Sequence, residues 1–285
     1  ITVNSMHADG HSPYNDSVLI KIGISEMEEV LADESATEKE MDAAIREVEK
    51  VIIDSKARFP FDEYLLTLEA DYAQKINDQE RAVKALERAF SEDSRDQFIA
   101  VMLSSIYVLR GDEGKGRKVL EEALRGRKAD RKLNYVYAEF LRKNVATSNE
   151  ELMYFYWRAH SPADNNYEAQ FWFARYAIES EKEEDIRKAI AAFSFLKKAR
   201  VSGVMKGKVR DYAMNGDKRK QFRVRLKSKR GVFGFVSVAN FPVDAHVEEE
   251  SFEEGIWDIL SVGDEFECSL GFTYHGVTCK DIRLL

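Results

Sequence analysis

Apolar residues recur every three to four positions from about residue 18 to residue 200, which is the spacing of one buried face of an α-helix. From residue 203 to residue 285 apolar and polar residues alternate instead, which is typical of half-buried β-strands. The opening stretch shows neither period. The pattern predicts an irregular segment over 1–17, a helical domain over 18–200 and a β domain over 203–285, joined by the short link 201–203.

The helical part repeats itself with a period of about 34 residues. Ala89 and Ala123, for example, take matching positions in successive repeats. Antiparallel helices approach closely where small residues face each other, so recurring Ala and Gly indicate stacked helix pairs. Upstream, the pattern predicts a helix over 38–57 as the second helix of another pair. This helix starts at the capping box from Thr37 to Glu40. We therefore expect about five helix pairs.

One repeat is clear enough to compare with a known family. The segment 97–126 resembles a tetratricopeptide repeat, and weaker copies follow to residue 199. The resemblance covers some two thirds of the chain and implies a right-handed α-α superhelix that binds a peptide or another protein domain. It names no ligand, and we assign no site residue there. The residues of 97–126 that carry the resemblance are Leu103, Ser104, Tyr107, Gly111, Asp112, Gly116, Leu120 and Ala123.

Basic residues alternate with other residues in 204–210 and again in 222–229, which predicts two strands with cationic outer faces. The Asn-Gly pair at 215–216 is a turn signal, so we expect these strands to form a hairpin. Residues 203–230 hold eleven Lys or Arg against two acids, whereas 231–285 hold two against eleven. Such a concentration of cations indicates contact with phosphates, although the whole chain has a net charge of −8. The candidate contacts are Lys206, Lys208, Arg210, Arg223, Arg225, Lys227, Lys229 and Arg230.

The next pieces of the β domain resemble a cold-shock domain in their order and spacing. Phe233-Gly234-Phe235-Val236 is similar to the first RNA-binding motif of that family, and 243–247 to the second. The pattern Leu260-x-x-Gly263-x-x-Phe266 is similar to the segment that closes its barrel. The resemblance covers about 231–285 and implies a five-stranded antiparallel OB barrel. It also implies binding of single-stranded RNA or DNA, with RNA favoured.

Three residues of these motifs are candidate contacts for bases. Side chains two apart on a strand share one face, so Phe233 and Phe235 are placed to stack on successive unpaired bases. His246 matches the stacking or hydrogen-bonding histidine of cold-shock domains. Asp244, two residues earlier, stands where the family usually has an aromatic residue.

Composition and spacing exclude several other classes. The five histidines are scattered, Cys268 and Cys279 are the only cysteines, and neither a Walker loop nor a G-x-S-x-G motif is present. We therefore expect no catalysis, no cofactor and no metal site. No apolar run is long enough to cross a membrane, which favours a cytoplasmic protein without membrane contacts. Because the chain starts at Ile1 without periodicity, we expect it to be the C-terminal part of a larger multidomain protein.

Two functions remain open at this point. In the first, the protein is a sensor or regulatory part in which an OB barrel binds single-stranded nucleic acid while a tetratricopeptide-like array binds protein. In the second, the whole chain is a protein-interaction scaffold, and the barrel caps or docks on the array without binding nucleic acid. Asp244 favours the second function, because a carboxylate beside a polyanion weakens binding.

Overall fold

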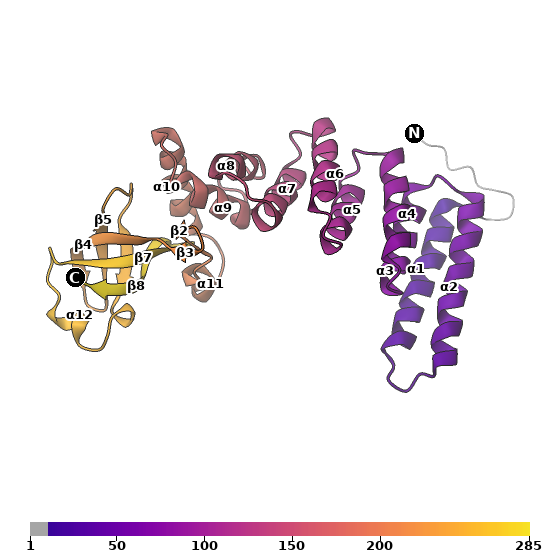
Figure 1. Cartoon of the computed structure of the whole chain (residues 1–285), viewed down its shortest axis with the longest axis horizontal. Coiled ribbons are helices and arrows are strands. Elements are labelled where there is room, and N and C mark those ends of the chain that lie inside the picture. The colour runs from indigo at the N-terminus through magenta and orange to yellow at the C-terminus, as the bar shows by residue number, and fades with distance from the viewer. Residues whose placement is uncertain (1–10) are drawn as a thin grey trace. The chain divides into compact units, whose positions relative to one another are not determined.

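A computed structural model describes residues 11–285 of the chain and divides it into two compact units, Ile1–Val145 and Ala146–Leu285. The first unit holds seven described helices, α1 (Pro13–Ala32), α2 (Glu38–Arg58), α3 (Glu63–Lys75), α4 (Gln79–Glu92), α5 (Gln97–Leu109), α6 (Glu113–Gly126) and α7 (Arg131–Asn144) (Figure 1). The second unit begins with α8 (Asn149–Arg158), α9 (Tyr167–Ala177), α10 (Glu183–Leu196) and α11 (Gly203–Gly207). Its remaining elements are β1 (Asp211–Tyr212), β2 (Met214–Asn215), β3 (Lys218–Arg219), β4 (Gln221–Arg230), β5 (Phe233–Val238), β6 (Ala245–Glu248), the 3-10 turn η1 (Glu249–Ser251), α12 (Ile256–Ile259), β7 (Glu265–Thr273) and β8 (Gly276–Leu284).

Helices α1–α10 form TPR-like helical repeats, as the period predicted. The small residues that recur along the repeats are buried, among them Ala82, Ala89 and Ala123. A Cβ added to Gly116 would lie 3.1 Å from the carbonyl oxygen of Ser104, so α5 and α6 approach closely because that residue is glycine. The protein is therefore an α+β molecule with a helical array and a C-terminal sheet. None of the described helices is both long and apolar enough to span a membrane.

The beginnings of two helices test the sequence predictions directly. The capping box of α2 is present: the Thr37 amide donates to Glu40 Oε2 at 2.8 Å, and the Glu40 amide donates to Thr37 Oγ1 at 3.3 Å. Helix α1 begins at Pro13, so the prediction of irregular structure over 1–17 is wrong for its last residues. Ser12 caps this helix, and proline fits its first turn, but its first buried residues, Asp16 and Ser17, are polar, and buried apolar residues begin only at Ile20. Residues 1–10 lie outside the described residues.

The sheet has six strands in the order β1-β7-β4-β5-β6-β8, and β7 also pairs with β8. Pairing therefore runs from β7 through β4, β5, β6 and β8 back to β7. The prediction of five antiparallel strands is wrong in two respects. Strand β1 adds a sixth strand at the side of β7, and β6 pairs with β8 in parallel at His246 and Thr278.

Strand β4 confirms the predicted strand over 222–229. Phe222, Val224 and Leu226 are buried, whereas Arg223 and Arg225 between them and Lys227 after them are exposed. Strands β5 and β6 alternate in the same way, with Val236 and Val247 turned inward. Because side chains alternate between the two faces of a strand, Phe233, Phe235 and His246 lie on the outer surface of the sheet.

The predicted strand over 204–210 is wrong, and so is its hairpin with 222–229. Residues 203–207 form α11, which is capped by the Ser202 side chain, and β4 pairs with β5 and β7. Val204 and Met205 are exposed, so these apolar side chains do not form the buried face that a half-buried strand would have. In so short a segment, alternation does not distinguish a strand from one helical turn. The turn at 215–216 instead joins β2 to β3, with Gly216 at φ +59°.

Gly234 lies between the two phenylalanines of β5, at a position where the structure leaves no room for a side chain. An added Cβ would clash with the backbone carbonyl of Ser228 and lie 3.1 Å from Cη2 of Trp257. We expect Gly234→Ala to lower the free energy of unfolding by about 1–3 kcal/mol. Gly203→Ala, at an open helical position, serves as the control and should stay within about 0.5 kcal/mol of wild type or be more stable.

Urea unfolding followed by tryptophan fluorescence measures this effect in the intact chain. The three tryptophans, Trp157, Trp172 and Trp257, all belong to the second unit, so their emission reports that unit. Equal stability of the Gly234→Ala and Gly203→Ala variants would show that β5 has room for a side chain at this position.

Candidate functional site

Three aromatic side chains meet on the outer surface of β5 and β6. Phe235 pairs with His246 across the two strands, and their ring centroids are 5.5 Å apart. The Phe233 ring lies 6.2 Å from the Phe235 ring and 5.6 Å from the His246 ring. We call Phe233, Phe235 and His246 the aromatic face. The structure therefore brings together the three residues that the sequence proposed for contacts with bases.

The rings of the aromatic face are turned away from the interior of the sheet. Phe235 is 37% exposed, and Phe233 and His246 are half-buried, while the residues on either side of Phe235 are buried. Large apolar side chains are rarely left on a sheet surface in a group, so this group is a candidate contact surface. Glu248, Glu249 and Glu250 line a hollow next to Phe233 and give that end of the face an acidic border.

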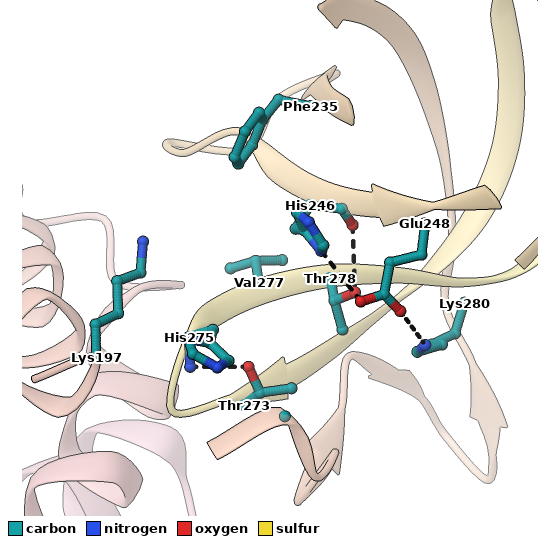
Figure 2. Close-up of a pocket in the computed structure, with 10 residues that line it drawn as sticks. Lys197, Phe235, His246, Glu248, Thr273, His275, Val277, Thr278 and Lys280 are labelled. Atoms are coloured by element: carbon teal, nitrogen blue, oxygen red, sulfur yellow. Dashed lines mark hydrogen bonds and ion pairs between the residues drawn. The ribbon is translucent and has the colours of Figure 1, made fainter. Parts of the chain in front are cut away.

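A cavity of about 370 Å³ opens beside Phe235 and His246 (Figure 2). One wall comes from the helices, through Lys197 after α10 and Gly207 at the end of α11. The opposite wall comes from β5, β6 and the turn between β7 and β8. The cavity has the size of a small-ligand pocket and mixes cations, imidazoles, hydroxyls and one aromatic ring. Its other lining residues are Glu248, Thr273, His275, Val277, Thr278 and Lys280.

Two hydrogen bonds and two charged contacts fix the sheet side of this cavity. Thr278 Oγ1 donates to the backbone oxygen of His246 at 3.2 Å, and the amide of His275 donates to Thr273 Oγ1 at 3.0 Å. Glu248 lies between two basic groups, 3.8 Å from His246 Nδ1 and 3.8 Å from Lys280 Nζ. These contacts hold His246 and the β7–β8 turn in place.

Burial favours the neutral form of both imidazoles of the cavity, because it lowers the pKa of each. Burial lowers the pKa of His246 below its usual value, Lys280 and Lys197 lower it further, and Glu248 opposes them. Burial likewise lowers the pKa of His275, with help from Lys206 and Lys197. A neutral imidazole donates one hydrogen bond and accepts another, and its ring stacks on a base without a charge.

The cations of β4 are exposed but largely engaged with acids of the same sheet. Arg223 Nε donates to one oxygen of Glu265 at 2.7 Å, and Arg225 Nη2 donates to the other at 2.6 Å. These hydrogen bonds lower the pKa of the Glu265 carboxyl. Lys227 Nζ of β4 lies 2.7 Å from Asp244, just before β6, so a lysine from across β5 pairs with the carboxylate that departs from the cold-shock pattern.

Three further predicted cations lie on β4 and after α11. Lys229 Nζ donates to the backbone oxygens of Trp257 and Leu260, at 2.5 and 3.0 Å, and so anchors the segment around α12. Arg230 is exposed at the end of β4, and Lys208 is exposed after α11. Arg230 pairs with Phe233 across β4 and β5, so this arginine lies beside the aromatic face, whereas Lys208 does not belong to these strands.

Two of the predicted cations make structural contacts within the second unit. Lys206 Nζ donates to the backbone oxygen of Lys197 at 2.9 Å. The side chain of Arg210 is 8% exposed and lies over the Tyr274 ring at 3.7 Å. Its Nε is 3.6 Å from Glu168 of α9, so this arginine is a structural contact within the second unit.

Sequence reasoning missed the cavity residues Lys197, His275 and Lys280. Lys197 lies in the helical domain, next to other lysines and arginines that follow α10, and nothing in its spacing sets it apart. His275 had one signal, a histidine followed by glycine in a turn between two strands. Among residues 11–285 no group of three or more His, Cys, Asp or Glu is arranged to hold a metal ion.

Comparisons with known proteins give only distant likenesses. No protein-family model and no curated protein matches the chain. A crystal structure of MamA protein aligns with a TM-score of 0.45 at 12% identity, over 66% of this chain and 97% of that one. MamA 41-end from Desulfovibrio magneticus RS-1 aligns with a TM-score of 0.43 at 11% identity, over 70% and 100%. A Thermobaculum terrenum O-GlcNAc transferase mutant aligns with a TM-score of 0.35 at 16% identity, over 50% of this chain and 25% of that one. We transfer no function from these likenesses.

Proposed function

We propose that the protein is an interaction scaffold of TPR-like repeats whose C-terminal sheet is a cold-shock-like OB barrel that binds single-stranded nucleic acid. The observation that carries the second part is the aromatic face, with three rings within 6.2 Å of one another on the outside of the sheet. In this function the protein binds its partners and catalyses no reaction.

The spacing of the rings supports contact with unpaired bases. Successive bases of an extended strand stack on aromatic side chains, and each such contact contributes about 1–3 kcal/mol. A duplex keeps its bases stacked inside, so this contact selects single strands. Because every base has a flat face, rings alone give little sequence preference.

The pairing of the strands supports the barrel. Each of β4, β5, β6, β7 and β8 has a neighbour on both sides, and the pairing returns to its starting strand. In OB barrels the strands that correspond to β5 and β6 present such a binding surface. His246 lies opposite Phe235 across these two strands, which supports a shared contact surface.

Phosphate contacts are expected to be few, because Arg223, Arg225 and Lys227 already neutralise acids of the sheet. If about three phosphates are neutralised, the logarithm of affinity falls against the logarithm of salt concentration with a slope of about −2 for a single strand. Stacking then provides the part of the affinity that does not depend on salt.

Fluorescence anisotropy with the intact protein tests this function. The probes are labelled RNA and DNA single strands of about eight nucleotides and a duplex of the same length, titrated between about 50 and 200 mM salt. We expect binding of single strands with the slope given above and much weaker binding of the duplex. Absence of single-strand binding at the lowest salt would refute nucleic-acid binding and leave the scaffold function.

A second candidate function is a scaffold in which the sheet contacts protein alone. The ion pairs of β4 favour it, because Glu265 and Asp244 occupy the cations that a polyanion would need. The acidic border of Glu248, Glu249 and Glu250 points the same way. The anisotropy titration separates the two functions, since a protein contact predicts no oligonucleotide binding at any salt concentration.

A further inference from the structure

The cavity beside Phe235 has a wall from the helical array, which a sheet alone does not provide. Lys197 directly follows α10, and its side chain extends from the helical side toward the strands that carry Phe235 and His246 (Figure 2). Its backbone is held in place, because its amide donates to Phe193 at 3.0 Å and its carbonyl accepts from Lys206 Nζ at 2.9 Å. The position of this lysine is therefore built into the second unit.

The charge of the cavity suits an anion. Lys197 has no ion pair among the described residues, in contrast to the cations of β4. Lys280 lines the same cavity from β8. Its Nζ is 3.8 Å from Glu248 Oε2, and His246 Nδ1 is 3.8 Å from Glu248 Oε1. Apart from its two imidazoles, the lining carries two positive charges, Lys197 and Lys280, and one negative charge, Glu248. A nucleotide whose base stacks on Phe235 carries a phosphate on its sugar, so phosphate is the anion expected next to the stacked base.

We propose that Lys197 holds a phosphate of the nucleotide whose base stacks on Phe235, so that the helical array contributes directly to the nucleic-acid site. This inference rests on the proposed function. It explains why a surface cation after a helix lies at the aromatic face, whereas most cations of the sheet are engaged elsewhere. It also makes the helical part of the second unit and the sheet one binding site.

Lys198 provides a matched control, because it is the next residue, is exposed and has the same charge. A general role of lysine at a helix C-terminus, where it interacts with the helix dipole, applies to both residues. Only the proposed phosphate contact distinguishes them, since Lys197 lines the cavity and Lys198 does not.

The test is anisotropy of a labelled single strand of about eight nucleotides with the full chain carrying Lys197→Ala, Lys198→Ala or Phe235→Ala. We expect Lys197→Ala to make the salt slope shallower by about 0.7 and to weaken binding about fivefold near 0.1 M salt. Lys198→Ala should behave as wild type, and Phe235→Ala should weaken binding without changing the slope.

The outcomes separate the inference from the function on which it rests. If Phe235→Ala weakens binding while Lys197→Ala and Lys198→Ala are alike, whether both unchanged or both weaker, the phosphate contact is overturned and the aromatic face stands. If the wild-type protein binds no strand, both are overturned. Tryptophan fluorescence of each variant confirms that the second unit is folded in every comparison.

Discussion

Phe235→Ala is expected to weaken binding of a short single strand about five- to 150-fold, which corresponds to the loss of about 1–3 kcal/mol of stacking. The ring is 37% exposed and lies 5.5 Å from His246, so it offers a flat face beside a second ring. The substitution removes contact area for a base and little buried volume from the sheet. Anisotropy titration of the variant at fixed salt measures the change.

Phe98→Ala is the control for this experiment, because Phe98 is a 59% exposed ring on α5, in the other unit of the chain. It should leave the affinity unchanged. Equal affinity of the Phe235→Ala variant and wild type would contradict the role of the aromatic face, and equal weakening by both substitutions would point to a nonspecific effect of losing an exposed ring.

Arg175→Ala is expected to lower the free energy of unfolding of the second unit by about 3 kcal/mol. The Arg175 side chain is 5% exposed, and its guanidinium lies 4.0 Å from the centre of the Phe272 ring. It donates to Asp211 at 2.6 Å, to Glu179 at 2.8 Å and to the Tyr212 carbonyl at 3.0 Å. Alanine leaves these acceptors without their donor and removes one of the contacts between α9 and the sheet.

Arg187→Ala is the matched control, because Arg187 also pairs with a glutamate one helical turn away but its side chain is 66% exposed. A solvent-exposed pair contributes well under about 1 kcal/mol, so this variant should unfold nearly as wild type does. Urea unfolding followed by tryptophan fluorescence compares the two. If both variants are equally stable, Arg175 does not join α9 to the sheet in the way described here.

The helical array was predictable because its period is long and regular. Small residues such as Ala89 and Ala123 recur at about 34 residues, and the capping box at Thr37 marks a helix start by local chemistry alone. The outer positions of the aromatic face were also predictable, since alternation along a strand decides which side chains share a surface.

The details that the sequence did not predict depend on contacts between distant residues. The basic alternation at 204–210 is typical of a strand. Strand β4, its expected partner, pairs with β5 on one side and β7 on the other. No local pattern shows that Arg223 and Arg225 meet Glu265, about forty residues along the chain. For the same reason Lys197 was missed, because its place at the cavity follows from how α10 packs on the sheet.

Photocrosslinking tests most directly the central claim that unpaired bases lie on the aromatic face. An oligonucleotide that carries 5-iodouracil is irradiated with the intact protein, and the modified peptides are identified by mass spectrometry. We expect adducts on Phe233, Phe235 or His246 and their loss in the presence of excess unlabelled strand. Adducts confined to α1–α9, or no adduct at a strand concentration that saturates the protein, would contradict the claim.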